Sequence, residues 1–179
     1  MTRYTVSDAT SLLQSYQQEQ LDRLDQLFGQ GTVPSFAQIK GDTVGGFLAP
    51  SAHHPWYVSL ARWALFEAPW ARWRGKRFAD SWEDGRQGAG VNLFAGGRER
   101  YRFTTAHAPA HGGFDGACLV LDYRPYRGMM YGLVDDMRLI QPGVCLGRMY
   151  WVPRGWAFVG YFMLVALGAS DPSPEVLTT

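Results

Sequence analysis

The second half of the chain is interrupted at short, regular intervals by residues that favour turns. After Pro69, apolar segments of roughly 8 to 12 residues alternate with turns such as Gly96-Gly97 and Pro142-Gly143. These connections are too short to hold a crossover helix, so consecutive strands must pair in antiparallel fashion. A chain built in this way is predicted to fold as a meander or as an up-and-down barrel.

The segments that read as strands share this length and an enrichment in aromatic and β-branched residues. They are residues 73–82, 90–95, 99–108, 117–123, 129–140, 144–152 and 156–167. We therefore expect a mostly β (α+β) fold, with an antiparallel β-barrel over residues 70–169. Residues 1–69 would form helices that pack outside the barrel or cap it, and the Pro-rich residues 170–179 would be a flexible tail.

The first third of the chain has helical periodicity. Residues 7–28 place Leu13, Tyr16 and Leu24 on one stripe, which predicts one amphipathic helix that ends before Gly29. A short helix is expected over residues 34–41 and a third over residues 54–67. Between these two helices, residues 41–48 read as a short strand or a turn.

Composition and charge exclude several classes of protein. The chain is 46% hydrophobic and 15% aromatic, which rules out disorder of the whole chain. Its 17 basic and 16 acidic residues nearly cancel, so no overall field attracts it to nucleic acid. No glycine-rich phosphate loop is present, and the histidine spacing fits no metal motif. We expect no cofactor and no metal.

Localisation follows from the apolar runs and the cysteines. The first residues lack a secretory signal, and the longest apolar run, residues 156–167, is shorter than the roughly 20 residues that a membrane helix needs. This predicts a cytoplasmic protein with no membrane partner. Cys118 and Cys145 lie in apolar segments and are predicted to be free thiols. The sequence is compatible with a homodimer.

Strand alternation gives residues 98–107 two different faces. Arg98, Arg100 and Arg102 share one face, which must meet water. Tyr101, Phe103 and His107 share the other and are predicted to point into the barrel. His107 then has two interpretations: a wet or hydrogen-bonded histidine near the rim, or an acid/base that contacts a ligand.

Residues 117–123 are apolar on both faces, so Asp122 is a candidate buried carboxylate. Burial without a partner would raise its pKa and suit it to acid/base catalysis. The alternative is a structural ion pair with Arg124 or Arg138.

Asp135 and Asp136 must lie on opposite faces of one strand, so they cannot form a catalytic dyad. Tyr131 shares the row of Asp135, and Arg138 shares that of Asp136. Lys76 is interpreted as a solvated or carbonyl-capping residue, with a Schiff-base or anion-binding lysine as the alternative.

One segment resembles a known family. The residues from Trp73 to Phe78 read W-R-G-K-R-F and follow a helix ending at Phe28, a glycine-centred segment and a second apolar stretch. Together with Asp135 and the Leu146-Gly147 pair, this order resembles bacterial GXWXG / DUF4334-like proteins. The namesake motif itself is incomplete, because residues 41–45 carry its two glycines but no Trp. The resemblance implies a lipocalin-like (calycin) barrel and leaves the activity open.

Two functions remain in competition. The first is a barrel that binds a small hydrophobic, aromatic or polyene-like molecule in its interior. The second is a cofactor-independent isomerase, cyclase or lyase, for example in secondary-metabolite biosynthesis, that uses the same cavity. Its catalytic candidates are His107 and Asp122. The expected ligand-binding residues are Trp82, Tyr101, Phe103, Tyr123, Tyr131, Asp135 and Arg138.

Overall fold

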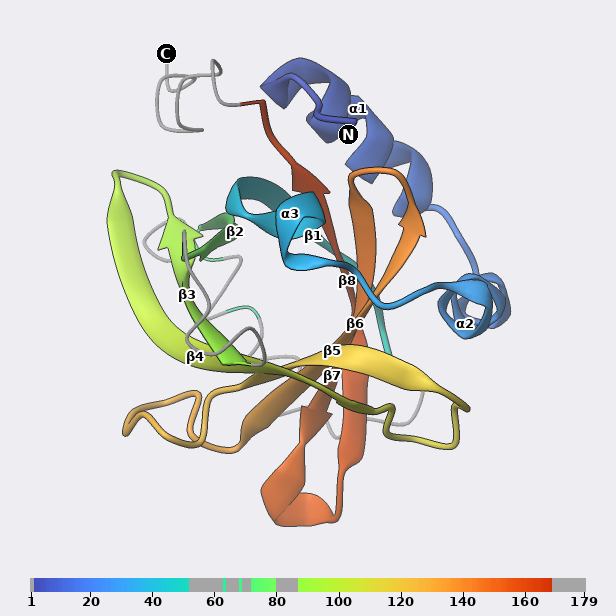
Figure 1. Cartoon of the computed structure of the whole chain (residues 1–179), viewed down its shortest axis with the longest axis vertical. Helices are drawn as coiled ribbons and strands as arrows, with labels where there is room; N and C mark the ends of the chain where they lie inside the picture. The colour runs from blue at the N-terminus through green and yellow to red at the C-terminus, as the bar shows by residue number, and fades with distance from the viewer. Residues whose placement is uncertain (1, 52–62, 64–67, 69–71, 80–86, 169–179) are drawn as a thin grey trace.

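The strands close into a barrel. A computed structural model describes residues 2–51, 63, 68, 72–79 and 87–168, and within these residues eight strands form a closed antiparallel barrel in sequence order (Figure 1). Each strand pairs with the next along the chain, and β8 closes the barrel against β1. The antiparallel barrel predicted from the short connections is confirmed.

The strands have the following bounds: β1 Gly41–Pro50, β2 Trp73–Phe78, β3 Gln87–Phe94, β4 Arg98–Pro109, β5 Ala117–Asp122, β6 Leu133–Gln141, β7 Val144–Trp151 and β8 Ala157–Ala166. The barrel thus begins at Gly41, and the prediction that it begins near residue 70 is wrong. The segment that read as a short strand or a turn is a ten-residue strand, β1, which pairs with both β2 and β8. Its glycines hid the alternation that marks a strand.

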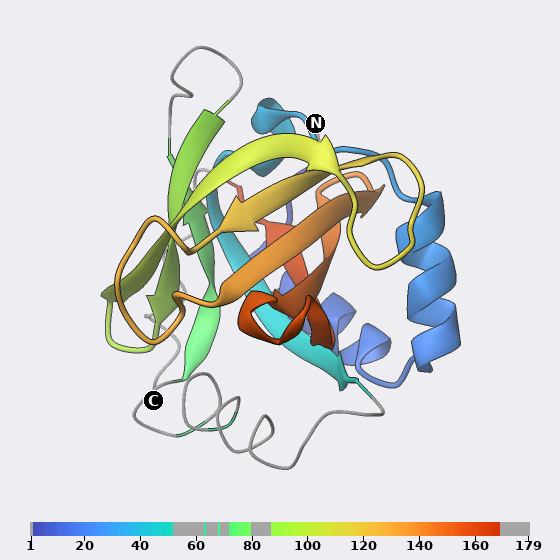
Figure 2. The same ribbon diagram turned by 90° about the horizontal axis from the view of Figure 1, so that it is seen from below.

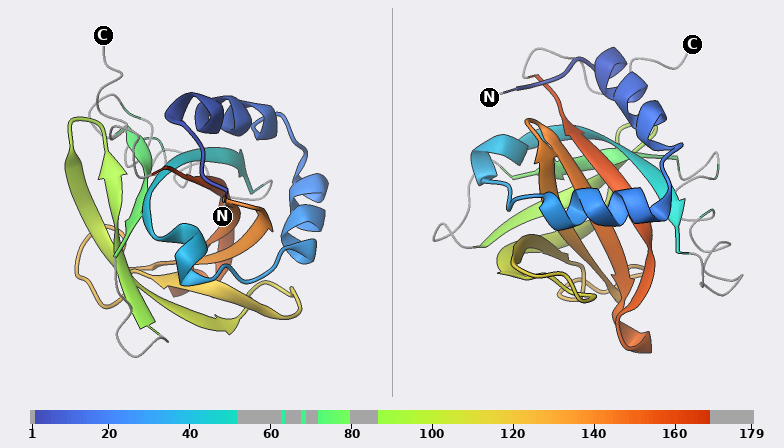
Figure 3. Two further views of the ribbon diagram at one scale, coloured as in Figure 1. Left: turned by 45° about the horizontal axis from the view of Figure 1, so that its top comes forward. Right: turned by 90° about the vertical axis from the view of Figure 1, so that its right-hand side faces the viewer.

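The N-terminal helices lie outside the barrel (Figure 3). Helix α1 spans Val6–Tyr16 and α2 spans Leu21–Gln30, so the single helix predicted over residues 7–28 is in fact two. The first is capped by Thr5, whose hydroxyl accepts from the backbone N–H of Asp8. The helix predicted over residues 54–67 and the tail at residues 170–179 fall largely or wholly outside the described residues.

Apolar residues cover both surfaces of the sheet. Outside, Leu13 of α1 packs on Val144 and Val165, and Leu24 and Phe28 of α2 pack near Tyr161. Because the helices cover these strands, both rows of β8 are apolar, as its sequence requires. Inside, one continuous apolar cluster lines the barrel.

One end of the barrel is covered by α3. This short helix, Phe36–Ile39, is held by a capping box between Ser35 and Gln38, and it lies across the barrel in the view of Figure 1. Ile39 is buried and belongs to the interior cluster. Figure 2 shows the molecule from below, with the loop between β5 and β6 beside the barrel.

Two further predictions can be compared with the structure. Cys118 and Cys145 are both buried free thiols, as expected. Among the described residues, no helix has the length and apolar character needed to cross a membrane.

Candidate functional site

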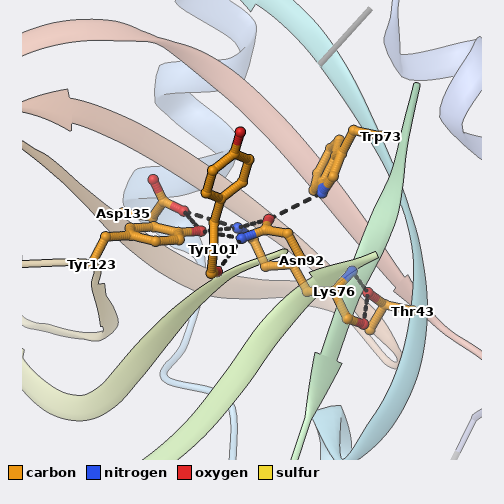
Figure 4. Close-up of polar contacts among 7 residues, drawn as sticks. All are labelled: Thr43, Trp73, Lys76, Asn92, Tyr101, Tyr123 and Asp135. Carbon is orange, nitrogen blue, oxygen red and sulfur yellow. Dashed lines mark hydrogen bonds and ion pairs between the residues drawn. The ribbon is translucent and has the colours of Figure 1, made fainter. Parts of the chain in front are cut away.

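A cluster of polar side chains lies inside the barrel. It consists of Lys76 on β2, Asn92 on β3, Tyr123 after β5 and Asp135 on β6, together with the indole N–H of Trp73 (Figure 4). All five side chains are buried. The cluster is nearer the end at which β2 and β6 begin, which is the end opposite α3.

A β-bulge places two of these residues on the same face of β2. Trp73 pairs with Phe94, and Gly75 pairs with the next residue, Leu93, so Arg74 is an extra residue in the strand. The bulge lets Trp73 and Lys76 both face inward although they are three positions apart. Gly75 has a φ of 149°, and a Cβ atom there would come within 2.1 Å of a backbone oxygen of β1. The position therefore requires glycine.

Lys76 is the centre of the cluster. Only 4% of its side chain is exposed, and its Nζ donates to Oδ1 of Asn92 at 3.0 Å and to Oδ2 of Asp135 at 3.2 Å. It also donates to the hydroxyl of Tyr123. The backbone of Lys76 is anchored by Thr43, whose hydroxyl accepts from its N–H and donates to its carbonyl. The ammonium group thus has three partners for its three N–H bonds.

Asn92 connects the cluster to the neighbouring strand. Its Oδ1 accepts from both Trp73 and Lys76, and its Nδ2 donates to the carbonyl of Tyr101 at 2.9 Å and to the Tyr123 hydroxyl at 3.3 Å. The carbonyl of Tyr101 is available because β4 has a second bulge there, where Tyr101 adopts a φ of 57°. Both bulges therefore aim groups into the cluster.

Tyr123 and Asp135 complete the cluster. The Tyr123 hydroxyl donates to Oδ2 of Asp135 at 3.2 Å, the same oxygen that accepts from Lys76. The other carboxylate oxygen, Oδ1, is buried and has no hydrogen-bond partner among the described residues. Asp135 is therefore only half satisfied, which is uncommon for a buried carboxylate.

Burial shifts the pKa of each ionisable group. Desolvation lowers the pKa of Lys76, and the adjacent Asp135 carboxylate offsets part of this effect. Desolvation raises the pKa of Asp135, and Lys76 offsets part of that effect in turn. Desolvation and the Asp135 charge also raise the pKa of Tyr123. These opposite shifts bring the pKa values of Lys76 and Asp135 closer together than those of a solvated Lys and a solvated Asp.

Aromatic rings surround the ammonium group. Its Nζ lies 5.1 Å from the ring centroids of Phe103, Tyr123 and Phe162 and 5.5 Å from that of Trp73. These distances are in the range of cation–π attraction, which stabilises a desolvated cation. The site is an aromatic enclosure around a single charged pair.

Four of the residues predicted to line the site are brought together. Tyr123 and Asp135 belong to the polar cluster. Phe103 is buried beside it, and Tyr101 packs half-buried on the interior cluster with its ring against Phe94. Trp82 lies outside the described residues.

The two predicted catalytic residues lie elsewhere. His107 is opposite Leu119, an interior residue, so it shares the inward row, but its side chain is exposed. His107 is thus on the predicted row but not enclosed, which fits the first of its two interpretations, a wet or hydrogen-bonded histidine near the rim. Asp122 lies opposite Val134 on the outward row. Partial burial alone would raise the pKa of Asp122, but hydrogen bonds from Arg124 outweigh this and lower it. The second interpretation of Asp122, a structural ion pair with Arg124, is confirmed.

Tyr131 and Arg138 are also away from the cluster. Tyr131 is 57% exposed, in the loop before β6. Arg138 is buried on the outer surface, where its guanidinium donates to the carbonyls of Phe28 and Gly29 at the end of α2 and to that of Ala117. Arg138 thus attaches α2 to the barrel.

Asp136, the neighbour of Asp135 that faces outward, is also buried. Asp136 accepts from the backbone of His111 at 2.6 Å and lies 2.8 Å from its Nδ1. The His111 ring stacks on Trp156 with centroids 3.9 Å apart. The prediction that Asp135 and Asp136 lie on opposite faces is therefore confirmed, and Asp135 is the inward one.

Lys76 was not predicted as a site residue, and its interpretation as a solvated lysine is wrong. It is one of only two lysines in a chain with fifteen arginines. That scarcity, together with its position between a tryptophan and a phenylalanine in W-R-G-K-R-F, was the available signal. The bulge at Gly75 concealed the inward orientation, since simple alternation places Trp73 and Lys76 on opposite faces.

A narrow apolar pocket lies at the α3 end. It has about 170 Å³, including space open to solvent, and is lined by residues that include Ile39, Phe78, Met137 and Cys145. The described residues contain no group of three or more side chains that could hold a metal ion. The polar cluster is separate from this pocket, whose lining includes neither Lys76 nor Asp135.

Comparisons with known proteins establish the fold. A crystal structure of a protein from Thermomonospora curvata superposes with a TM-score of 0.54 at 14% sequence identity, covering 90% of this chain and 99% of that one. At this identity the likeness concerns the fold alone. No family model and no curated protein matches the chain.

Proposed function

We propose that this chain binds a small, mainly hydrophobic or aromatic molecule inside the barrel, with a polar group of that molecule held by the cluster of Lys76, Tyr123 and Asp135. The observation that carries the proposal is the half-satisfied Asp135 in an aromatic enclosure. A buried ion pair adds little stability compared with apolar residues of similar volume. A function that uses the pair explains its presence better than stability does.

Substitution of Thr105 tests whether the molecule binds inside the barrel. It is 1% exposed and lies opposite Leu121, an interior residue, whereas its neighbour Thr104 lies opposite Asp122 on the outward row. The substitution Thr105→Phe fills interior volume, and Thr104→Phe adds the same ring outside the barrel. We expect the fluorescent probe N-phenyl-1-naphthylamine to bind the wild type and Thr104→Phe, and to lose at least tenfold in affinity for Thr105→Phe.

Folding of both variants is checked by circular dichroism during thermal unfolding. If Thr105→Phe unfolds, Thr105→Leu replaces it, with Thr104→Leu as the matched control. Equal affinity in the interior and exterior variants would place the probe on the outer surface and contradict the proposal. Native mass spectrometry of the freshly purified protein gives an independent check, with a co-purifying small molecule as the supporting result.

A second candidate is a cofactor-independent enzyme, favoured by one observation. Asp135 carries a raised pKa and an unengaged oxygen, and the Tyr123 hydroxyl lies 3.2 Å from its other oxygen. The unengaged oxygen is a base that can take a proton from carbon next to a carbonyl. The test is exchange of the α-hydrogens of 1-tetralone in D₂O, followed by NMR. Acceleration by the wild type and its loss in Asp135→Asn would support catalysis; no acceleration would leave only binding.

A further inference from the structure

The hydrogen bonds of the polar cluster leave one atom without a partner. Each N–H of Lys76 has an acceptor, and both oxygen lone pairs and both N–H bonds of Asn92 are used. The Tyr123 hydroxyl accepts twice and donates once. Oδ2 of Asp135 accepts twice. Among the described residues, only Oδ1 of Asp135 lacks a partner within the cluster.

The unpartnered atom is an acceptor, and this determines what it can recognise. We propose that the polar group of the bound molecule is a hydroxyl of an alcohol, phenol or enol, which donates its hydrogen bond to Oδ1 of Asp135. This inference rests on the proposed function, because it names the chemistry of the molecule that the barrel binds. The aromatic rings of Phe103, Phe162 and Trp73 then contact its apolar body.

Other polar groups fit the cluster less well. A ketone, ether or ester offers only acceptors, and the cluster has no free donor for them. A carboxylate or phosphate would meet the lone pairs and the negative charge of Asp135 in a desolvated site. Formation of an imine at Lys76 would remove N–H bonds that already donate to three acceptors. We therefore assign Lys76 the role of holding Asp135 and Tyr123 in position.

The substitution Asp135→Asn reverses the chemistry at this one atom. Lys76 and Tyr123 both donate to the Oδ2 position, so the amide oxygen of the asparagine must occupy it. The NH₂ group then takes the place of Oδ1, and an acceptor becomes a donor of nearly the same shape. Asp122→Asn is the matched control, because Asp122 lies on the outward row and pairs with Arg124.

The test uses two probes with the same naphthalene ring, 2-naphthol with a hydroxyl donor and 2-methoxynaphthalene with a methoxy group that only accepts, measured by isothermal titration calorimetry. The wild type and Asp122→Asn should bind 2-naphthol about tenfold or more tightly than the ether, as expected for a hydrogen bond to a charged acceptor. Asp135→Asn should bind the two probes within about threefold of each other, because its amide NH₂ accepts no hydrogen bond and can donate to either oxygen.

The experiments distinguish failure of the hydroxyl inference from failure of the proposed function. If the wild type binds both naphthalenes equally, or prefers the ether, the hydroxyl inference is overturned, and binding inside the barrel is still decided by the Thr105 and Thr104 variants. If neither naphthalene nor N-phenyl-1-naphthylamine binds, the proposed function itself is wrong. An unchanged preference in a folded Asp135→Asn would place the hydroxyl against another group. The wild-type preference alone tests the inference if Asp135→Asn does not fold.

Discussion

At the scale of single residues, the interior is defined by a charged pair that apolar packing would not require. Lys76 and Asp135 are each almost fully buried, and their 3.2 Å contact compensates only part of the cost of desolvation. Removal of one partner leaves an uncompensated charge, whereas removal of both leaves none. The two members of the pair therefore depend on each other.

The energetic coupling of the pair can be measured with a double-mutant cycle. We expect Lys76→Met to lower the free energy of unfolding by about 3–5 kcal/mol, because it leaves Asp135 buried without its cation. In Lys76→Met/Asp135→Asn the loss should be clearly smaller than the sum of the two single losses. Urea unfolding followed by tryptophan fluorescence measures all four proteins. Additive losses would show that the pair contributes no coupling.

At the scale of elements, the two bulges decide what faces the interior. The one at Gly75 turns Trp73 and Lys76 inward together, and the one at Tyr101 directs a carbonyl to Asn92. The arrangement of antiparallel strands was predictable, since it follows from turn residues and connection length. The bulges were not, because the extra residue of a bulge leaves no periodic mark in a single sequence. This explains why Phe103 and Asp135 were found and Lys76 was misinterpreted.

The bulge on β2 gives a matched pair of glycine substitutions. In Gly75→Ala the new Cβ would come within 2.1 Å of the carbonyl oxygen of Thr43, so we expect a loss of about 3 kcal/mol or more, above the usual cost of overpacking. Gly96 also has a positive φ, but nothing lies within 4 Å of a Cβ there. Gly96→Ala should cost about 1 kcal/mol, the strain of the left-handed backbone alone. Equal losses in the two variants, measured by thermal unfolding, would contradict the role given to the bulge.

At the scale of the whole molecule, the fold keeps two weak acids away from water, Cys145 inside the barrel and Tyr150 opposite Val134 on the outward row. Burial raises the pKa of the Cys145 thiol from 9.0 to about 12 and that of the Tyr150 hydroxyl from 10.0 to about 12. Both groups are neutral in the folded barrel at pH values where an unfolded chain ionises them. Alkaline pH therefore favours the unfolded chain.

The stability of the protein should fall on the alkaline side. Because the folded pKa of Cys145 is above its ordinary value of 9.0, its contribution is fully present below that pH and is lost as pH rises toward about 12. Each such group lowers the free energy of unfolding by about 1.4 kcal/mol per pH unit within this window. Cys145→Ala should reduce the slope above pH 9 in urea titrations, whatever its effect at neutral pH. An unchanged slope would show that Cys145 does not ionise on unfolding.

The seam between β1 and β8 has a consequence for the kinetics of folding. Every other strand pair joins neighbours in the chain, but this pair brings Thr43 against Ala166, about 120 positions apart. Closing so long a loop is entropically the most expensive step, and contacts that require it form after the local hairpins. The seam should therefore form late, so that substitutions along it accelerate unfolding while the rate of folding stays nearly unchanged.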